Sequence, residues 1–352
     1  LAEWRLKVAE TPPEELGKRI AENPNLTRMA VLMNQKNAES LGELERILSQ
    51  HGSSLDRELR GYAEFKISHE MRRRSAKPNV EIIPGCYDAL SAKLIADAGY
   101  EVAFMSGFAV SAARLGLPDT GLISFTEMLD SLRNCCVAAS PIPLIGDGDT
   151  GYGNALNVQR TVTEYARAGA ACVMIEDQIS PKKCGHTRGK QVILRDEARM
   201  KIRAAVDARA DADILIMART DARAVHGFDE ALARCHDFEA EGADIIFLEA
   251  PETEDEMRRF CKAMSKPCMA NMVPGGKTPI LPPQQLQEIG YKLALYPVML
   301  LSSAITAMQA ALVALRPESN MPMPPAISFA ELQSVVGFPG YWQREMKYQV
   351  KD

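Results

Sequence analysis

Two patterns of hydrophobic and polar positions divide the chain near residue 76. Before that point, apolar residues recur at helical spacing between polar breaks, and we expect helices around residues 13–21, 38–49 and 54–75. From Val80 onward, short apolar runs alternate with amphipathic segments. The chain is therefore expected to have a helical N-terminal extension over residues 1–76 and a separate folded domain after it.

The second pattern predicts a series of short strands separated by helices. The predicted strands are 81–83, 102–105, 143–145, 171–175, 214–218, 244–248, 267–270 and 293–296. The helical patterns between them include 89–98, 158–168, 198–208, 228–241 and 253–264. Alternating strands and helices form parallel βαβ units. Eight such units over residues 77–316 predict an α/β fold, a (β/α)₈ barrel of the TIM type.

Nearly every predicted strand is followed by a polar or ionisable residue. These residues are Tyr87, Ser106 with Gly107, Asp147 with Asp149, Glu176 with Asp177, Arg219 with Asp221, Glu249, and Asn271. A single acidic residue after a strand is ordinary helix capping. Active sites of these barrels form at the carboxyl ends of the strands, so a converging ring of carboxylates, an arginine and an asparagine predicts a functional site.

Composition and charge exclude several classes of partner. The chain has 352 residues, 46% hydrophobic and 25% charged, with a net charge of -5 and a pI near 5.7. Neither a nucleic-acid partner nor an anionic membrane surface is expected. No apolar run approaches about 18 residues, so no membrane span is expected. Eight cysteines without CxxC spacing predict free thiols in a reducing compartment, with cytoplasm, mitochondrion and plastid left open.

The loop Gly146–Gly153 suggests a metal site. It contains a GxGxxG spacing after a strand, but its two aspartates would repel a dinucleotide pyrophosphate. Two carboxylates on a glycine-rich loop suit a hard cation that keeps several waters, either Mg²⁺ or Mn²⁺. Asp147, Asp149 and Glu176 are the candidate ligands, and the alternative is a tight turn with solvated aspartates.

Cys184 lies on a polar loop between Lys182-Lys183 and His186. Cationic neighbours lower the pKa of a thiol, which favours a catalytic acid/base, although free cysteines are more often buried and inert. His186 is placed to tune or relay its proton. Arg219 is predicted to emerge at the barrel mouth and bind a carboxylate in bidentate fashion, or else to pair with Glu249 or Asp221.

These groups form a coherent set for one type of chemistry. A metal would polarise a 2-oxo or 2-hydroxy acid and stabilise an enolate, while the thiol gives or takes the proton at the neighbouring carbon. That combination predicts retro-aldol cleavage, or its reverse, of a 2-hydroxy di- or tricarboxylate.

From about Val80 to its C-terminus the chain resembles the isocitrate lyase/phosphoenolpyruvate mutase superfamily. The matching motifs are Pro84–Ala89, Ser106-Gly107, Leu117–Gly121, Asp147–Asn154, Ile175–Gln178, Lys182–His186, Ala218–Ala222 and Gly275–Pro279. The resemblance implies a (β/α)₈ barrel whose C-terminal helices are exchanged between subunits of a homodimer or homotetramer. In this chain the exchanged segment would be residues 317–352, with its centre at Phe329–Tyr348.

The resemblance also implies residue roles. Asp147, Asp149 and Glu176 would form the Mg²⁺ shell with Asp119 as an outer helper. Ser106, the Gly107 and Phe108 amides, and Arg219 would bind the substrate carboxylate, with Tyr87 and Asn271 also in the substrate site. Cys184 would be the acid/base, and Lys182, His186 and Glu249 would complete the catalytic pocket. Phe104 departs from relatives that often carry a tyrosine there.

Within the superfamily, the lyases carry a cysteine in this loop, whereas phosphoenolpyruvate mutases and phosphonopyruvate hydrolases typically carry asparagine. The resemblance thus favours carbon–carbon cleavage of a 2-alkylmalate or 2-methylisocitrate type of acid. Carboxyvinyl-carboxyphosphonate phosphorylmutases also have a Cys-Gly-His loop, so phosphonate chemistry is the alternative, and a non-catalytic interaction protein is the third. Oxaloacetate hydrolases typically have a serine where this chain reads Tyr296-Pro297, which makes that reaction less expected.

Overall fold

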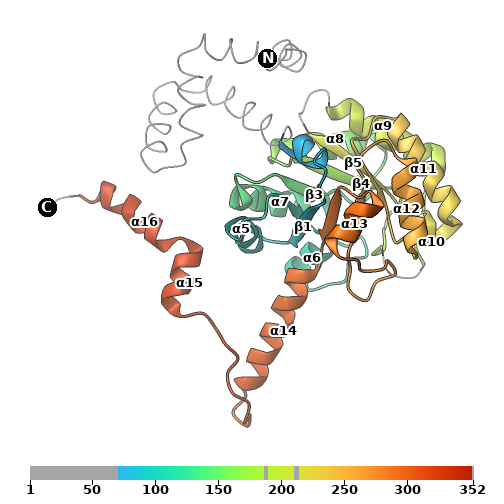
Figure 1. Cartoon of the computed structure of the whole chain (residues 1–352). Coiled ribbons are helices and arrows are strands. Elements are labelled where there is room, and N and C mark those ends of the chain that lie inside the picture. Colours follow the sequence, from blue (N-terminus) through green and yellow to red (C-terminus); the bar gives the residue numbers. More distant parts are fainter. Residues whose placement is uncertain (1–69, 186–188, 210–213, 351–352) are drawn as a thin grey trace. The chain divides into compact units, whose positions relative to one another are not determined.

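The computed structural model describes residues 70–185, 189–209 and 214–350 (Figure 1). The chain divides into two compact units between Lys66 and Ile67. Most of the N-terminal extension, with its three expected helices, lies outside the described residues, apart from a helical segment at 70–75. The domain boundaries at residues 76 and 316 therefore stay predictions.

Parallel strands form the expected barrel. They are β1 (Glu81–Cys86), β2 (Ala103–Met105), β3 (Leu144–Asp147), β4 (Cys172–Glu176), β5 (Leu215–Thr220), β6 (Ile245–Leu248), β7 (Met269–Asn271) and β8 (Leu293–Tyr296). They are hydrogen-bonded in the order β6-β5-β4-β3-β2-β1-β8-β7. A parallel bridge between Ile246 and Cys268 joins the two ends of this order and closes the barrel. The (β/α)₈ prediction is confirmed.

Helices connect the strands and lie outside them, and three more helices, α14 to α16, follow the last strand (Figure 1). They are α5 (Ala89–Asp97), α6 (Gly107–Val110), α7 (Phe125–Ala139), α8 (Ala155–Arg167), α9 (Arg195–Arg209), α10 (Arg223–His226), α11 (Phe228–Ala240), α12 (Glu254–Ala263), α13 (Pro283–Ile289), α14 (Met299–Ala314), α15 (Phe329–Val336) and α16 (Phe338–Glu345). Short π and 3₁₀ segments follow α6 at Ser111–Leu115 and α16 at Met346–Tyr348. No described helix is long and apolar enough to cross a bilayer.

Side-chain capping explains where several helices begin. Asp88, Ser124 and Asn154 each accept hydrogen bonds from backbone amides in the first turn of α5, α7 and α8, and each forms a reciprocal capping box. Thr253 caps α12 in the same position. These caps fix the helix starts directly after the loops that leave the strands.

Five strands continue further at their carboxyl ends than the apolar runs indicated, and in four of them the added residues include a polar residue of the expected site. Asp147, Glu176 and Asn271 are the last residues of β3, β4 and β7, and Arg219 lies inside β5. We expected these polar residues just past the strands, and that detail was wrong. A polar side chain on the cavity face does not prevent its backbone from joining the ladder, so the strand continues through it.

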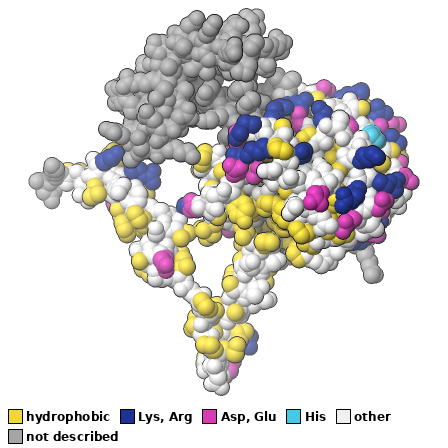
Figure 2. Space-filling model, in the orientation of Figure 1, with side chains coloured by type: hydrophobic (Ala, Val, Ile, Leu, Met, Phe, Trp, Pro, Cys, Tyr) yellow, Lys and Arg dark blue, Asp and Glu magenta, His cyan; other side chains and the backbone are white. Residues whose placement is uncertain are grey.

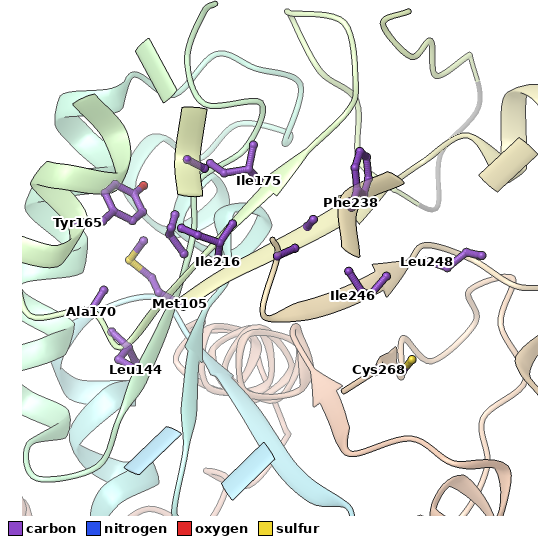
Figure 3. Close-up of a cluster of buried hydrophobic side chains, with 14 of the residues drawn as sticks. Met105, Leu144, Tyr165, Ala170, Ile175, Ile216, Phe238, Ile246, Leu248 and Cys268 are labelled. Carbon is purple, nitrogen blue, oxygen red and sulfur yellow. The ribbon is translucent and has the colours of Figure 1, made fainter. Parts of the chain in front are cut away.

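Successive side chains of each strand point alternately into and out of the barrel, and so they form two apolar layers. Leu215 and Met217 face the barrel interior, where they pack with residues such as Phe104, Met174 and Phe247. Ile216 and Ala218 face outward into a larger layer between the strands and the helices. Figure 3 shows part of that outer layer, with Met105 and Ile216 from strands and Tyr165 and Phe238 from helices.

The helical segment at 70–75 packs at the amino ends of the strands. Met71 is fully buried and belongs to the barrel-interior cluster. Arg72 pairs with Asp244, and Arg73 with Glu70. Arg74 pairs with Glu70 and with Glu101. Carboxylates thus neutralise the basic run at 72–74.

Candidate active site

Every second side chain of a strand points into the barrel, and at the carboxyl ends of the strands these inward positions bring polar side chains to one cavity. After interior residues Ile145, Met217 and Met269, the next inward positions are Asp147, Arg219 and Asn271. A cavity of about 200 Å³ opens at this end of the barrel. Its polar lining consists of Ser106, Asp119, Asp147, Lys182, Cys184, Arg219, Glu249, Asn271 and Ser302.

The Asp147–Asp149 loop is held in an unusual conformation. Asp147 accepts hydrogen bonds from the Gly107 amide (3.0 Å) and the Asp149 amide (3.1 Å). Asp149 has a φ of 48°, in the left-handed region that non-glycine residues rarely adopt. From α9, Lys201 donates to the Thr150 carbonyl at 3.1 Å. The loop therefore presents two buried carboxylates whose positions are fixed by the surrounding backbone.

Lys182 lies among these carboxylates. Its Nζ is 2.8 Å from Asp119 Oδ1, donates to Asp119 Oδ2 at 2.8 Å, and is 2.7 Å from Asp149 Oδ1. Burial opposes the charged amine, but Asp149, Asp147 and Asp119 raise the pKa of Lys182 well above its ordinary value. Burial raises the pKa of Asp149 to about 6, with Lys182 opposing the rise and Asp147 and Asp119 adding to it.

Several buried carboxylate oxygens lack a hydrogen-bond donor. Asp119 Oδ1, Asp149 Oδ1 and Glu176 Oε1 accept no hydrogen bond, although the first two lie within ion-pair distance of Lys182 at an angle unsuited to one. Burial raises the pKa of Glu176 well above its usual range, against the attraction of Arg219. Within the described ranges, no three such side chains are already arranged as a metal-ligand cluster. The ammonium of Lys182 lies between the carboxylates instead.

Arg219 is surrounded by acidic side chains. It makes two hydrogen bonds to Asp221, at 2.9 and 3.1 Å, and its guanidinium lies 3.2 Å from Glu176 and 3.4 Å from Glu249. Its Cζ also lies 5.2 Å from the centre of the Phe247 ring. Burial opposes the charge, but Asp221, Glu249 and Glu176 raise the pKa of Arg219 well above its ordinary value. The ion-pair role and a carboxylate-binding role are compatible, because Arg219 still lines the cavity.

Glu249 and Asn271 form the wall beside Arg219. Glu249 is completely buried and accepts hydrogen bonds from Asn271 Nδ2 at 3.4 and 3.2 Å. Both side chains line the cavity. Glu249 directly follows β6 and Asn271 ends β7, and the carboxyl ends of these two strands are adjacent in the closed barrel.

The loop that carries Cys184 starts at the end of β4 and packs against the mouth of the barrel. Gln178 donates to the Lys183 carbonyl at 2.8 Å and accepts from the Lys183 amide at 3.0 Å. A Cβ on Gly185 would lie 2.4 Å from Arg219 Nη2 and 2.9 Å from Glu249 Cδ. Only glycine allows the backbone to approach so closely, and this approach places the half-buried Cys184 at the cavity.

Some expected site residues lie elsewhere. Tyr87 does not line the cavity, and it packs against the outer apolar layer beside the start of α5. The Gly107 amide donates to Asp147. Phe108 does line the cavity, at 38% exposure. Asp149 and Glu176 lie behind the cavity surface. His186 lies outside the described residues.

The apolar part of the lining was not identified from the sequence, except for Phe104 and Phe108. It consists of Phe104, Phe108, Met174, Phe247, Val273, Leu295, Pro297 and Val298. Strand alternation was a usable signal for Met174, Phe247 and Leu295, which share the inward face with the polar residues. Val298 and Ser302 belong to the start of α14, and no local pattern indicated that this turn reaches the site.

Comparison with known proteins places this arrangement among enzymes. A family model described as phosphoenolpyruvate phosphomutase matches residues 71–316. The chain is 41% identical to the 2,3-dimethylmalate lyase of Eubacterium barkeri, covering 79% of this chain and 97% of the relative. It is 40% identical to the chloroplastic carboxyvinyl-carboxyphosphonate phosphorylmutase of Arabidopsis thaliana (80% and 85%) and 42% identical to the 2-methylisocitrate lyase of Aeropyrum pernix (69% and 77%).

Solved structures agree. The crystal structure of 2,3-dimethylmalate lyase, a PEP mutase/isocitrate lyase superfamily member, matches with a TM-score of 0.76 and 31% identity, covering 80% of this chain and 95% of that one. A complex of phosphonopyruvate hydrolase with oxalate and Mg²⁺ matches with a TM-score of 0.69 and 28% identity, covering 80% and 98%.

Proposed function

The chain belongs to the PEP mutase/isocitrate lyase superfamily, and from that premise we propose that it is a metal-dependent carbon–carbon lyase. It cleaves a 2-alkylmalate or 2-methylisocitrate type of 2-hydroxy acid into a 2-oxo acid and a second carboxylic acid. The observation that carries this proposal is the shared cavity of Cys184, Arg219 and the buried carboxylates. The lyases among its relatives support the same reaction class.

The donor set fits a hard divalent cation. Asp119, Asp149 and Glu176 each have a buried oxygen that accepts no hydrogen bond, and carboxylate oxygens are the ligands that Mg²⁺ prefers. Together with Asp147 they would hold Mg²⁺, with Mn²⁺ as the alternative. When bound, the metal supplies polarisation of the substrate's 2-oxygen and stabilises negative charge that develops on it. A relative's structure with Mg²⁺ and oxalate supports this assignment.

The chain's own residues then account for binding and proton transfer. Arg219 binds the carboxylate next to the reacting carbon, and Ser106 contributes at the start of α6. Glu249 accepts the proton of the 2-hydroxyl group. The electron pair left on the 2-oxygen forms the carbonyl bond of the 2-oxo acid as the carbon–carbon bond breaks. The electron pair of the broken bond passes to the carbon of the departing acid, and the Cys184 thiol donates a proton to that carbon. Lys182 and His186 complete the catalytic set.

The apolar lining supports a substrate with an alkyl substituent. Phe104, Met174, Phe247 and Leu295 are each nearly or fully buried and form the inner surface of the cavity. Lys182 and Arg219 are the cations of the described lining, and both are already paired with carboxylates. An alkylmalate with two carboxylates therefore fits this lining better than an acid with three.

Exposed apolar residues on the C-terminal helices support a homo-oligomer. Figure 2 shows hydrophobic side chains gathered along α14, α15 and α16. They include Ile305, Met308, Leu312, Leu315, Phe329, Leu332, Tyr341 and Trp342, all more than 40% exposed. Such a surface is unfavourable in water unless another surface covers it. The subunit exchange expected for residues 317–352 would cover it in a dimer or tetramer.

The proposed function is tested by 2-oxo acid release from a panel of 2-alkylmalates, 2-methylisocitrate, isocitrate and oxaloacetate, with Mg²⁺ and with EDTA. Metal-dependent release from an alkylmalate supports the lyase.

The Arabidopsis phosphorylmutase relative favours phosphonate chemistry as the second candidate. A phosphorus-containing product in ³¹P NMR, with no turnover of the hydroxy acids, would replace the first proposal by the second. If neither assay detects a product and the protein binds no Mg²⁺, a non-catalytic role would be favoured.

A further inference from the structure

Lys190 connects the loop that carries Cys184 to the Asp221–Arg219 ion pair. Its Nζ lies 2.5 Å from the Gly185 carbonyl oxygen and 2.7 Å from Asp221 Oδ1, and both hydrogen bonds are buried. Asp221 in turn accepts two hydrogen bonds from Arg219. One ammonium group therefore joins the residue after Cys184 to the carboxylate that orients Arg219.

The loop is tied down on both sides of Cys184. Before it, Gln178 holds both backbone groups of Lys183, and Lys182 is bonded to Asp119. After it, Lys190 donates a hydrogen bond to the Gly185 carbonyl. The chain then returns to the barrel, where Val192 forms an antiparallel bridge with Gln178.

The positive charge of Lys190 holds together two oxygen atoms that would otherwise repel each other. The Gly185 carbonyl oxygen and Asp221 Oδ1 lie 2.5 and 2.7 Å from the same nitrogen, so the negative end of a carbonyl dipole lies close to a carboxylate oxygen. Without the ammonium they would repel each other in a water-excluded site, where such interactions are strong. Asp221 is held by Arg219, so the loop is the part that would move away.

We propose that Lys190 is a positioning residue, which fixes Cys184 at the cavity by binding the Gly185 carbonyl to Asp221. Lys190 does not line the cavity, so it acts through the loop and not on the substrate. Its effect on turnover rests on the proposed lyase function. The position of the loop is a property of the free protein and is measured without any substrate.

The first arm of the test measures access to Cys184 in the free, full-length protein. Lys190→Met and wild type are treated with iodoacetamide or the bulkier fluorescein maleimide, and labelling of the Cys184 peptide is followed by mass spectrometry. We expect the ratio of the maleimide labelling rate to the iodoacetamide labelling rate to rise about tenfold in Lys190→Met, because the loop opens locally. Lys183→Met is the matched control, since it removes an exposed lysine from the same loop. Its ratio should equal that of wild type.

The second arm measures turnover. Lys190→Met is expected to lower kcat about 100-fold while KM changes less than threefold, because the acid/base is misplaced while Arg219 remains paired with Asp221. Lys190→Arg should restore both the labelling ratio and kcat, because a guanidinium donates to two oxygens at once. General destabilisation would instead lower the melting temperature without the change specific to Cys184.

Wild-type labelling and kcat in Lys190→Met would overturn the proposal, as would an equal effect in Lys183→Met. If Lys190→Met does not fold, the labelling ratio and kcat are measured instead in Lys190→Gln, which keeps an amide donor group but removes the charge. An inactive wild type would count against the lyase function only. The labelling arm would still decide whether Lys190 positions the loop.

Discussion

The Lys182 ammonium lies 2.7 Å from Asp149 Oδ1, between the carboxylates that we propose as metal ligands. A divalent cation and this ammonium would neutralise the same cluster of negative charge. Asp149 is held there in a left-handed backbone conformation, with its carboxyl group buried. A costly conformation persists where the surrounding structure requires it, and such residues cluster at active sites.

Replacing Asp149 with Asn should therefore weaken metal binding. The amide keeps the shape of the side chain but removes one negative charge from the cluster. We expect the affinity for Mg²⁺ to fall at least about 10–100-fold, measured by calorimetry on metal-free protein, and EDTA to abolish turnover of wild type. Asp196→Asn is the control, because that side chain is 92% exposed on α9. Unchanged Mg²⁺ affinity in Asp149→Asn would remove this residue from the metal site.

Cys184→Ala should abolish proton donation while leaving the cavity intact. We expect kcat to fall about 10²–10⁴-fold, with substrate affinity nearly unchanged in direct binding measurements. The matched control is Cys136→Ala on α7, where burial raises the pKa of the thiol and keeps it inert. Full activity in Cys184→Ala would contradict the acid/base assignment.

Arg219→Lys should lower kcat/KM strongly, because an ammonium does not reproduce bidentate carboxylate binding. It would also lose one of the two charge-assisted hydrogen bonds to Asp221, and such a bond contributes about 1.5–3 kcal/mol to folding stability. Steady-state kinetics and chemical denaturation test the two effects separately. The comparison is Arg223→Lys on α10, where Arg223 forms an ion pair with Glu252. Equal kinetics of the two variants would argue against substrate binding by Arg219.

Gly185→Ala is a steric test of the loop. The new Cβ would lie 2.4 Å from Arg219 Nη2, far closer than normal contact, so the loop or the arginine must shift. Since a misplacement of about 1 Å can cost about 100-fold in rate, we expect kcat to fall by that order. Gly340→Ala, where a Cβ meets nothing within 4 Å, should leave kcat unchanged. A fully active Gly185→Ala would show that the loop does not need this close approach.

Removal of residues 317–352 should change the oligomeric state. The deletion takes away α15 and α16, whose exposed apolar side chains include Phe329 and Trp342. We expect a homodimer or homotetramer for the full chain and a smaller, aggregation-prone species for the truncated one. Light scattering coupled to size-exclusion chromatography measures this directly. A monomeric full chain would contradict subunit exchange.

The sequence by itself determined the barrel. Eight apolar runs separated by helical patterns leave few other ways to bury both faces of every strand. The apolar runs and helical patterns were local signals, readable within a few residues. Once the structure extends the strands through Asp147, Arg219 and Asn271, alternation places these side chains on one inward face, because successive side chains of a strand point in opposite directions.

Contacts between distant segments were decided only by the tertiary structure. Lys182 meets Asp119, 63 residues away, and Lys190 meets Asp221, 31 residues away, because loops after different strands converge at one end of the closed barrel. Tyr87 was expected in the substrate site, but the turn into α5 places it against the outer layer. Ser302 reaches the cavity from α14 without any local signal. Spacing along a chain fixes which face a residue occupies, whereas its partner depends on how the whole barrel closes.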